Sequence, residues 1–276
     1  MHPARALESL LLAFCTSLML APAQAQDLKE QLPAPLDLKA VTFAADTGDG
    51  ISAFTSIANK SFKPEGQGPF PAAVVMHTCG GIRNPHIRQH AQELLKAGYV
   101  VLVVDSFGPR GFEFCTRMPN PSTGIADAYG ALAYLQAKPF VDKSRVYQVG
   151  YSWGAMISTL LASPQSAVLA GSSARFAGTV ANYSTCAFRD MQLVYKDADK
   201  PFLLLMGADD KELPSTSCFP LLESMKQAGA PVEWYVYPGA SHGWDKRGQA
   251  DRGYLYDGKI TDDATARMLA FFTKIR

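Results

Sequence analysis

The chain has 276 residues, of which 47% are hydrophobic and 18% are charged, as in an ordinary globular protein that buries a full core. Its 26 Lys and Arg residues balance 25 acidic residues, and the net charge of +1 disfavours a nucleic-acid-binding or anionic-membrane surface. At this length an α/β fold usually forms one domain.

The first 25 residues have the pattern of a signal peptide. His2 and Arg5 precede an apolar run over residues 10–20, and the small residues that end at Ala25 fit the signal-peptidase rule. The run is far shorter than the roughly 20 residues that cross a bilayer, so a transmembrane anchor is the weaker interpretation. We therefore expect cleavage after Ala25 and an exported protein, either periplasmic or secreted, without membrane insertion.

The segment after the signal peptide predicts an irregular lead-in followed by a hairpin. Residues 26–37 contain two prolines among mixed polar residues and are interpreted as a linker. Alternating patterns over residues 38–44 and 51–58 flank the turn-forming residues 46–50. These two strands are expected to form an antiparallel edge of the sheet.

The next segment predicts a strand, helix, strand unit. Residues 72–76 and 100–104 are continuous apolar runs, typical of parallel strands that are buried on both faces. Between them Asn84 as cap, Pro85 in the first turn and Gly98 after the last turn predict the two ends of a helix.

The remaining pattern alternates between helices and strands. In chain order the expected elements are a helix over 125–137, a strand over 145–149, a helix over 155–162, strands over 176–181 and 202–206, a helix over 215–228, a strand over 232–237 and a helix over 263–275. This alternation predicts a mostly parallel, doubly wound sheet with helices on both faces. We expect one catalytic domain of this α/β class over residues 38–276.

The sequence Gly150-Tyr151-Ser152-Trp153-Gly154 has the G-x-S-x-G form of a nucleophile elbow. The bare motif occurs by chance in many proteins, where the serine is an ordinary turn residue. Here a predicted strand precedes it and a predicted helix follows it. That context favours a sharp turn that presents the Ser152 hydroxyl as a nucleophile.

A serine nucleophile needs a base and a group that orients the base. Two loops after predicted strands supply them in the expected chain order, with Asp210 in the first and His242 in the second. We assign Ser152 as nucleophile, His242 as general base and acid, and Asp210 as the group that fixes the imidazole. Asp209 is the competing candidate for Asp210, its other role being to cap the next helix or hold the loop.

The tetrahedral intermediate of such a reaction needs backbone donors for its oxyanion. The amide of Trp153, directly after the nucleophile, is one candidate. The loop after residues 72–76, His77-Thr78-Cys79-Gly80-Gly81, offers the other, and we choose the Cys79 amide over that of Thr78. His86 and His90 are four residues apart on a predicted helix but lack the H-E-x-x-H pattern, so we interpret them as solvated and expect no metal.

These loops, together with residues 105–111, resemble the dienelactone hydrolase family over residues 38–276. The resemblance implies a single-domain α/β hydrolase that opens lactones or cleaves esters without a cofactor. Two positions depart from the founding members, which carry cysteine where this chain has Ser152 and glutamate where it has Thr78. The departures favour conventional serine-triad chemistry over the dienelactone substrate.

Four cysteines remain after removal of the signal peptide, an even number in an oxidising compartment. Cys79 and Cys115 follow two strands that we expect to be neighbours. Cys186 and Cys218 follow the next two strands beyond the nucleophile. We therefore favour disulfides between Cys79 and Cys115 and between Cys186 and Cys218, the alternative being buried free thiols.

The sequence thus predicts an exported serine hydrolase that acts on a small ester, thioester or lactone through an acyl-enzyme. The alternatives are a small peptidase of the same fold and a catalytically silent binding protein. Arg110 could bind a substrate carboxylate or only brace its own loop. Tyr151 and Trp244 are further candidates for substrate contact. The sequence gives no oligomeric state.

Overall fold

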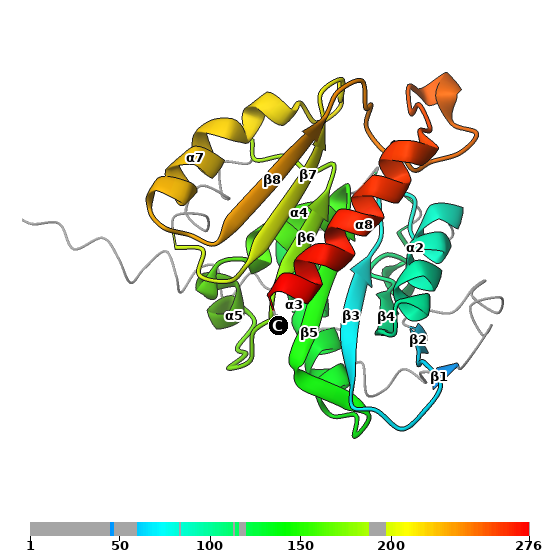
Figure 1. Cartoon of the computed structure of the whole chain (residues 1–276), viewed down its shortest axis with the longest axis vertical. Helices are drawn as coiled ribbons and strands as arrows, with labels where there is room; N and C mark the ends of the chain where they lie inside the picture. The colour runs from blue at the N-terminus through cyan, green and yellow to red at the C-terminus, as the bar shows by residue number, and fades with distance from the viewer. Residues whose placement is uncertain are drawn as a thin grey trace, which may run out of the picture. The chain divides into compact units, whose positions relative to one another are not determined.

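The computed structural model describes residues 45–46, 60–82, 84–112, 114–115, 120–187 and 197–275 (Figure 1). Within them one eight-stranded sheet has the strand order β1-β2-β4-β3-β5-β6-β7-β8. Six strands, β3 to β8, run parallel to one another, which confirms the predicted mostly parallel sheet. The predicted signal peptide and the predicted hairpin strands at 38–44 and 51–58 lie outside the described residues.

The edge of the sheet next to the amino terminus contains the antiparallel pairing. β2 (Lys60–Phe62) runs antiparallel to β4 (Val100–Val104), as expected of an antiparallel N-terminal edge. The short β1 (Ala45–Asp46) lies parallel to β2 rather than antiparallel to it. The described part of this edge is therefore mixed.

The central strands are buried on both faces, which explains their continuous apolar runs. In β3 (Phe70–Met76), Val74 and Met76 join one hydrophobic cluster, whereas Ala73 and Val75 join another on the opposite face. Alternate side chains point to opposite faces of a strand, so a doubly covered strand needs apolar residues at every position.

Helices cover both faces of the sheet (Figure 1). On one face α3 (Pro121–Gln136) and α4 (Trp153–Leu161) pack through Leu132 and Ile157. On the other face α2 (Pro85–Lys96) and α8 (Gly258–Lys274) pack through Leu94 and Phe272. The remaining principal elements are β5 (Val141–Tyr151), α5 (Pro164–Leu169), β6 (Thr179–Asn182), β7 (Phe202–Gly207), η4 (Ser215–Ser217), α7 (Phe219–Gln227) and β8 (Val232–Tyr237). No helix among these elements is long and apolar enough to cross a membrane.

The strand registers bring the carboxyl ends of the parallel strands to one edge. Met76 of β3 pairs with Gly150 of β5, and Tyr151 pairs with Asn182 of β6. Gly207, the last residue of β7, pairs with Tyr237, the last of β8. The loops after β3, β5, β7 and β8 therefore open at the same edge, where parallel sheets place their sites.

Several helix ends differ from the sequence prediction. α3 begins at Pro121 instead of residue 125, and α8 begins at Gly258 instead of residue 263, because polar side chains cap both ends. The Asn120 side chain accepts a hydrogen bond from the Ser122 amide, and Asp257 accepts from two amides of its first turn. The predicted helix over 215–228 is split into η4 and α7.

Candidate active site

The site is built on the turn between β5 and α4. Ser152 occupies this turn with φ 52° and ψ −111°, a backbone conformation that is strained for any residue with a side chain. Both flanking glycines are required by packing. A Cβ atom on Gly150 would collide with the Gly154 carbonyl, and one on Gly154 would collide with the Met76 carbonyl. The motif therefore forms the sharp turn that the sequence predicts.

Three side chains form a continuous hydrogen-bonded chain at this turn. The Ser152 hydroxyl Oγ lies 2.9 Å from His242 Nε2, and His242 Nδ1 lies 2.8 Å from Asp210 Oδ2. All three residues are buried, with exposed fractions of 4%, 2% and 4%. This is the geometry in which a carboxylate orients an imidazole and the imidazole accepts a serine proton.

The loop after β7 brings Asp210 rather than Asp209 to the imidazole. Asp210 Oδ1 accepts hydrogen bonds from the amides of Glu212 (3.0 Å) and Leu213 (2.7 Å), which leaves Oδ2 for His242. These bonds fix the orientation of the carboxylate. Asp209 is exposed, and its amide donates to the Ala240 carbonyl in the neighbouring loop.

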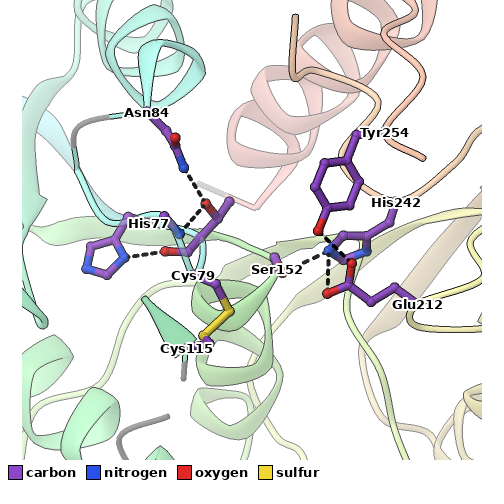
Figure 2. Close-up of a disulfide and its surroundings, with 10 residues drawn as sticks. His77, Cys79, Asn84, Cys115, Ser152, Glu212, His242 and Tyr254 are labelled. Atoms are coloured by element: carbon purple, nitrogen blue, oxygen red, sulfur yellow. Dashed lines mark hydrogen bonds and ion pairs between the residues drawn. A yellow bond between two sulfur atoms is a disulfide. The ribbon is translucent and has the colours of Figure 1, made fainter. Parts of the chain in front are cut away.

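The loop after β3 lies against the elbow and is fixed from both ends (Figure 2). The Gly154 amide donates to the His77 carbonyl at 3.1 Å, which ties the start of α4 to this loop. The Thr78 carbonyl accepts from His77 Nδ1 at 2.7 Å and from the Gly81 amide at 2.9 Å. In a trans peptide the N–H and C=O groups point in opposite directions. The Cys79 N–H therefore points away from the Thr78 carbonyl and its two donors.

His77 is a neutral imidazole with both ring nitrogens in use. Nδ1 donates to Thr78, and Nε2 accepts from the Ser106 amide at 3.1 Å. Burial is the main reason that the pKa of His77 is lowered, which favours this neutral form. Its ring also stacks on Trp153 with 5.5 Å between ring centroids. His77, which the sequence placed only at a strand end, thus orients the loop that offers the Cys79 amide.

Two disulfides join the loops at this edge of the sheet. Cys79 is bonded to Cys115 with a Cα–Cα distance of 5.0 Å, and Cys186 is bonded to Cys218 with a distance of 4.8 Å. Both pairs are those predicted from the order of the strands. The first disulfide holds the loop that carries the Cys79 amide (Figure 2).

The three side chains suggested for substrate contact are engaged in contacts within the protein or buried. Arg110 donates to both carboxylate oxygens of the buried Asp127 at 2.7 Å and also to the Ser106 carbonyl at 2.8 Å. This pairing favours the bracing alternative for Arg110, and its role in carboxylate recognition stays a prediction. Tyr151 is buried and stacks on His90, and Trp244 is 1% exposed, so neither side chain is open to solvent, and their substrate contact stays a prediction.

A buried polar network lies behind the His242 ring. His90 Nε2 lies 2.8 Å from Asp245 Oδ2, and the Tyr183 hydroxyl donates to both Asp245 oxygens at 2.9 Å. The edge-to-face contact between Tyr183 and His242 has 5.0 Å between centroids. Burial opposes charge on His90, but hydrogen bonds to Asp245 and Glu93 raise its pKa to about 9. The network therefore contains a buried ion pair.

The prediction that His86 and His90 are solvated was wrong. Both are buried, with exposed fractions of 4% and 3%, because α8 and the loop after β8 cover this face of α2. Burial lowers the pKa of His86 to about 4, so it stays neutral. Among the described residues no group of three or more His, Cys, Asp or Glu side chains could hold a metal ion.

Two residues without a predicted role lie beside the imidazole of His242 (Figure 2). Glu212 Oε1 is 3.8 Å from His242 Nε2, and Glu212 Oε2 accepts a 2.8 Å hydrogen bond from the Tyr254 hydroxyl. The sequence offered a signal for Glu212, which is two residues after Asp210. It offered none for Tyr254, which reaches the site from a long irregular loop.

The sheet, the elbow and the hydrogen-bonded chain define an α/β hydrolase. The chain belongs to the dienelactone hydrolase family, whose family model matches residues 57–276. A relative from Methylorubrum extorquens, which carries the provisional name carboxymethylenebutenolidase, is 26% identical over 78% of this chain and 75% of its own length. A protein from Escherichia coli with the same provisional name is 23% identical over 88% of this chain and 89% of its own length.

Solved structures share the fold. A protein from Klebsiella pneumoniae, provisionally named a dienelactone hydrolase, superposes with a TM-score of 0.64 at 23% identity, over 78% of this chain and 92% of its own. The dienelactone hydrolase-like promiscuous phosphotriesterase P91, from metagenomic libraries, gives a TM-score of 0.64 at 17% identity, over 79% and 92% of the two chains. These likenesses establish the fold and, with the family, a hydrolase.

Proposed function

We propose that this protein is an exported serine hydrolase that cleaves a carboxylic ester, thioester or lactone through an acyl-enzyme. Membership of the dienelactone hydrolase family supports ester or lactone hydrolysis. The observation that carries the serine mechanism is the chain of hydrogen bonds from Ser152 through His242 to Asp210. Export rests on the pattern of the first 25 residues.

In the first half-reaction the Ser152 oxygen attacks the acyl carbon while its proton passes to His242 Nε2. The carbonyl oxygen becomes an oxyanion, and the amides of Cys79 and Trp153 donate hydrogen bonds to it. When this intermediate collapses, the bond to the leaving group breaks and the leaving group takes the proton from His242. The acyl group then remains on Ser152.

In the second half-reaction water takes the place of the leaving group. His242 Nε2 accepts a proton from the water as its oxygen attacks the acyl carbon, and the same two amides stabilise the second oxyanion. Collapse breaks the bond to Ser152, which regains a proton from His242, and releases a carboxylic acid. Asp210 remains ionised and stabilises the imidazolium in both steps.

The Trp153 amide is suited to the oxyanion role by its place in α4. It belongs to the first residue of the helix, and the first amides of a helix have no partner within it. The following amide, that of Gly154, is already bonded to the His77 carbonyl. Developing negative charge at this helix terminus is also favoured by the helix dipole.

Substrate turnover and covalent labelling test the proposal together. A panel of p-nitrophenyl esters, lactones, thioesters and a p-nitroanilide should identify acyl substrates that the wild type hydrolyses. A fluorophosphonate probe should label the wild type but not Ser152→Ala, whereas the control Ser224→Ala, at an exposed position of α7, should be labelled and active. Labelling or ester turnover that persists in Ser152→Ala would refute the nucleophile, and turnover of the anilide alone would favour a peptidase.

The export part is tested separately. Expression of the full chain in a Gram-negative host should yield a mature protein in the periplasm or the medium whose amino-terminal residue is Gln26. An uncleaved protein that stays with the cytosol would refute export while leaving the hydrolase proposal intact.

A further inference from the structure

Glu212 places a second carboxylate against the imidazole, on the side opposite Asp210. Asp210 contacts His242 Nδ1 at 2.8 Å, whereas Glu212 lies 3.8 Å from Nε2. Nε2 is the nitrogen that, in the proposed mechanism, hands a proton to the leaving group. At 3.8 Å the Glu212 carboxylate is too far for a hydrogen bond, so it acts on this position through its charge.

Two hydrogen bonds hold the Glu212 carboxylate in this position. Its backbone amide is bonded to Asp210 Oδ1, and its Oε2 accepts the 2.8 Å bond from the Tyr254 hydroxyl. Burial and the bond to Glu212 raise the pKa of Tyr254 to about 12, so the hydroxyl stays protonated and keeps donating at neutral pH. Figure 2 shows both side chains converging on His242.

The charge of Glu212 is accessible, whereas the neighbouring lysine is covered. The Glu212 side chain is 49% exposed. Lys246 is 6% exposed, its Nζ lies 4.1 Å from the centroid of the Tyr254 ring, and its single positive charge interacts with three carboxylates, those of Asp245, Glu212 and Asp210. Arg110, which could have attracted an anionic group, is paired with Asp127. A substrate that enters beside His242 therefore meets a negative charge.

We propose that Glu212, positioned by Tyr254, makes the site prefer esters whose alcohol part is cationic or neutral over esters whose alcohol part is anionic. This inference rests on the proposed hydrolase function and names the charge class of its substrate. The oxygen of the leaving alcohol must lie within about 3 Å of His242 Nε2 to accept its proton. A charged group two or three bonds further along the alcohol then lies at roughly 6 Å from the Glu212 carboxylate. In this half-exposed position the interaction should change kcat/KM by about threefold to tenfold.

Three acetate esters that differ in charge but little in shape provide the test: those of choline, of 3,3-dimethylbutanol and of 2-hydroxyethanesulfonate. Acid release should show that the wild type favours the cationic ester over the neutral one, and the neutral ester over the anionic one. In Glu212→Gln, which keeps an acceptor for Tyr254, the cation-to-neutral ratio of kcat/KM should fall about threefold to tenfold. Tyr254→Phe should lower the ratio less, because the carboxylate remains but loses its anchor.

The matched control is Glu223→Gln, which removes the same charge from an exposed position of α7 and should keep the wild-type ratio. High salt should reduce the preference of the wild type. An unchanged ratio in Glu212→Gln, or an equal loss for all three esters, would overturn the selectivity role in an enzyme that is still a hydrolase. Failure of the wild type to hydrolyse any ester in the wider panel would instead remove the proposed function and this inference with it.

Discussion

Removal of the Cys79–Cys115 disulfide should reduce turnover, whereas removal of the Cys186–Cys218 disulfide should not. The double alanine variant of the first pair keeps the backbone amide at position 79 but releases its loop from the loop that follows β4. The double alanine variant of the second pair releases two loops on the other side of β5. The second variant is therefore a matched control for the first.

The loop lengths predict nearly equal losses of stability. The first pair is separated by 36 residues and the second by 32, and loop-closure entropy gives about 4 kcal/mol for each. The effect on kcat should differ, because only the first variant loosens an amide that we propose as a donor to the oxyanion. Complete loss of one such donor lowers kcat by roughly 10²- to 10³-fold, so partial displacement should lower it about tenfold or more.

Guanidinium unfolding and steady-state kinetics on one p-nitrophenyl ester would measure both effects. We expect similar decreases in the free energy of unfolding for the two variants and a decrease in kcat, with little change in KM, for the first variant alone. Equal kcat values for the two variants under conditions where both are folded would refute the link between this disulfide and the oxyanion donor.

Three other variants test separate parts of the structure. Asp210→Asn should lower kcat by about 10⁴-fold and Asp209→Asn by less than about threefold, and kinetics that rank them in the opposite order would reverse the assignment. Arg110→Leu should lower the free energy of unfolding by about 3 kcal/mol, because it leaves the buried Asp127 carboxylate unpaired, and should affect neutral and anionic esters alike; a selective loss for anionic esters would restore the recognition role. The pKa of His90 is raised from 6.5 to about 9 in the folded protein, so the stability that its charged form contributes is present below pH 6.5 and lost as the pH rises through 9. Urea unfolding of the wild type should show this loss, up to about 3 kcal/mol, and His90→Gln should lack it; the same slope in both proteins would contradict the ion pair.

Local patterns were sufficient to predict the sheet and the three residues of the hydrogen-bonded chain. Ser152, Asp210 and His242 each follow a strand with a clear apolar pattern, and parallel strands bring such positions to one edge. The disulfide pairing could be predicted for the same reason, since β3 lies beside β4 and β6 lies beside β7. These features depend on strand order and not on side-chain detail.

Helix ends were harder to predict where capping and apolar periodicity disagree. The apolar spacing of α3 begins at Ile125, yet Asn120 and Pro121 start the helix four residues earlier. The helix expected over 155–162 does end before Pro164, but the sequence pattern did not predict that Pro164 begins a further helix, α5, with Ser163 as its cap. Proline both ends one helix and fits the first turn of the next, so its position alone does not distinguish the two.

The charged partners of the site were beyond sequence reasoning because no local motif marks which polar groups pair with one another. Arg110 and Asp127 come from different elements, and His90 lies 155 residues before Asp245. Both histidines on α2 have polar side chains that fit a solvated helix face, and only the packing of α8 over that face buries them. Which polar groups are buried depends on tertiary packing, and so do the resulting pKa shifts.

The backbone conformation of Ser152 favours a different residue from the one that the proposed chemistry needs. At φ 52° and ψ −111° the position is one that glycine adopts freely and serine does not, at a cost of the order of 1–3 kcal/mol. Replacement by glycine would relieve that strain, but it would also remove the hydrogen bond to His242 and give the unfolded chain more freedom. The strain comes from the Cβ atom and the hydroxyl contributes the hydrogen bond to His242, so a serine here is retained against the preference of its own backbone.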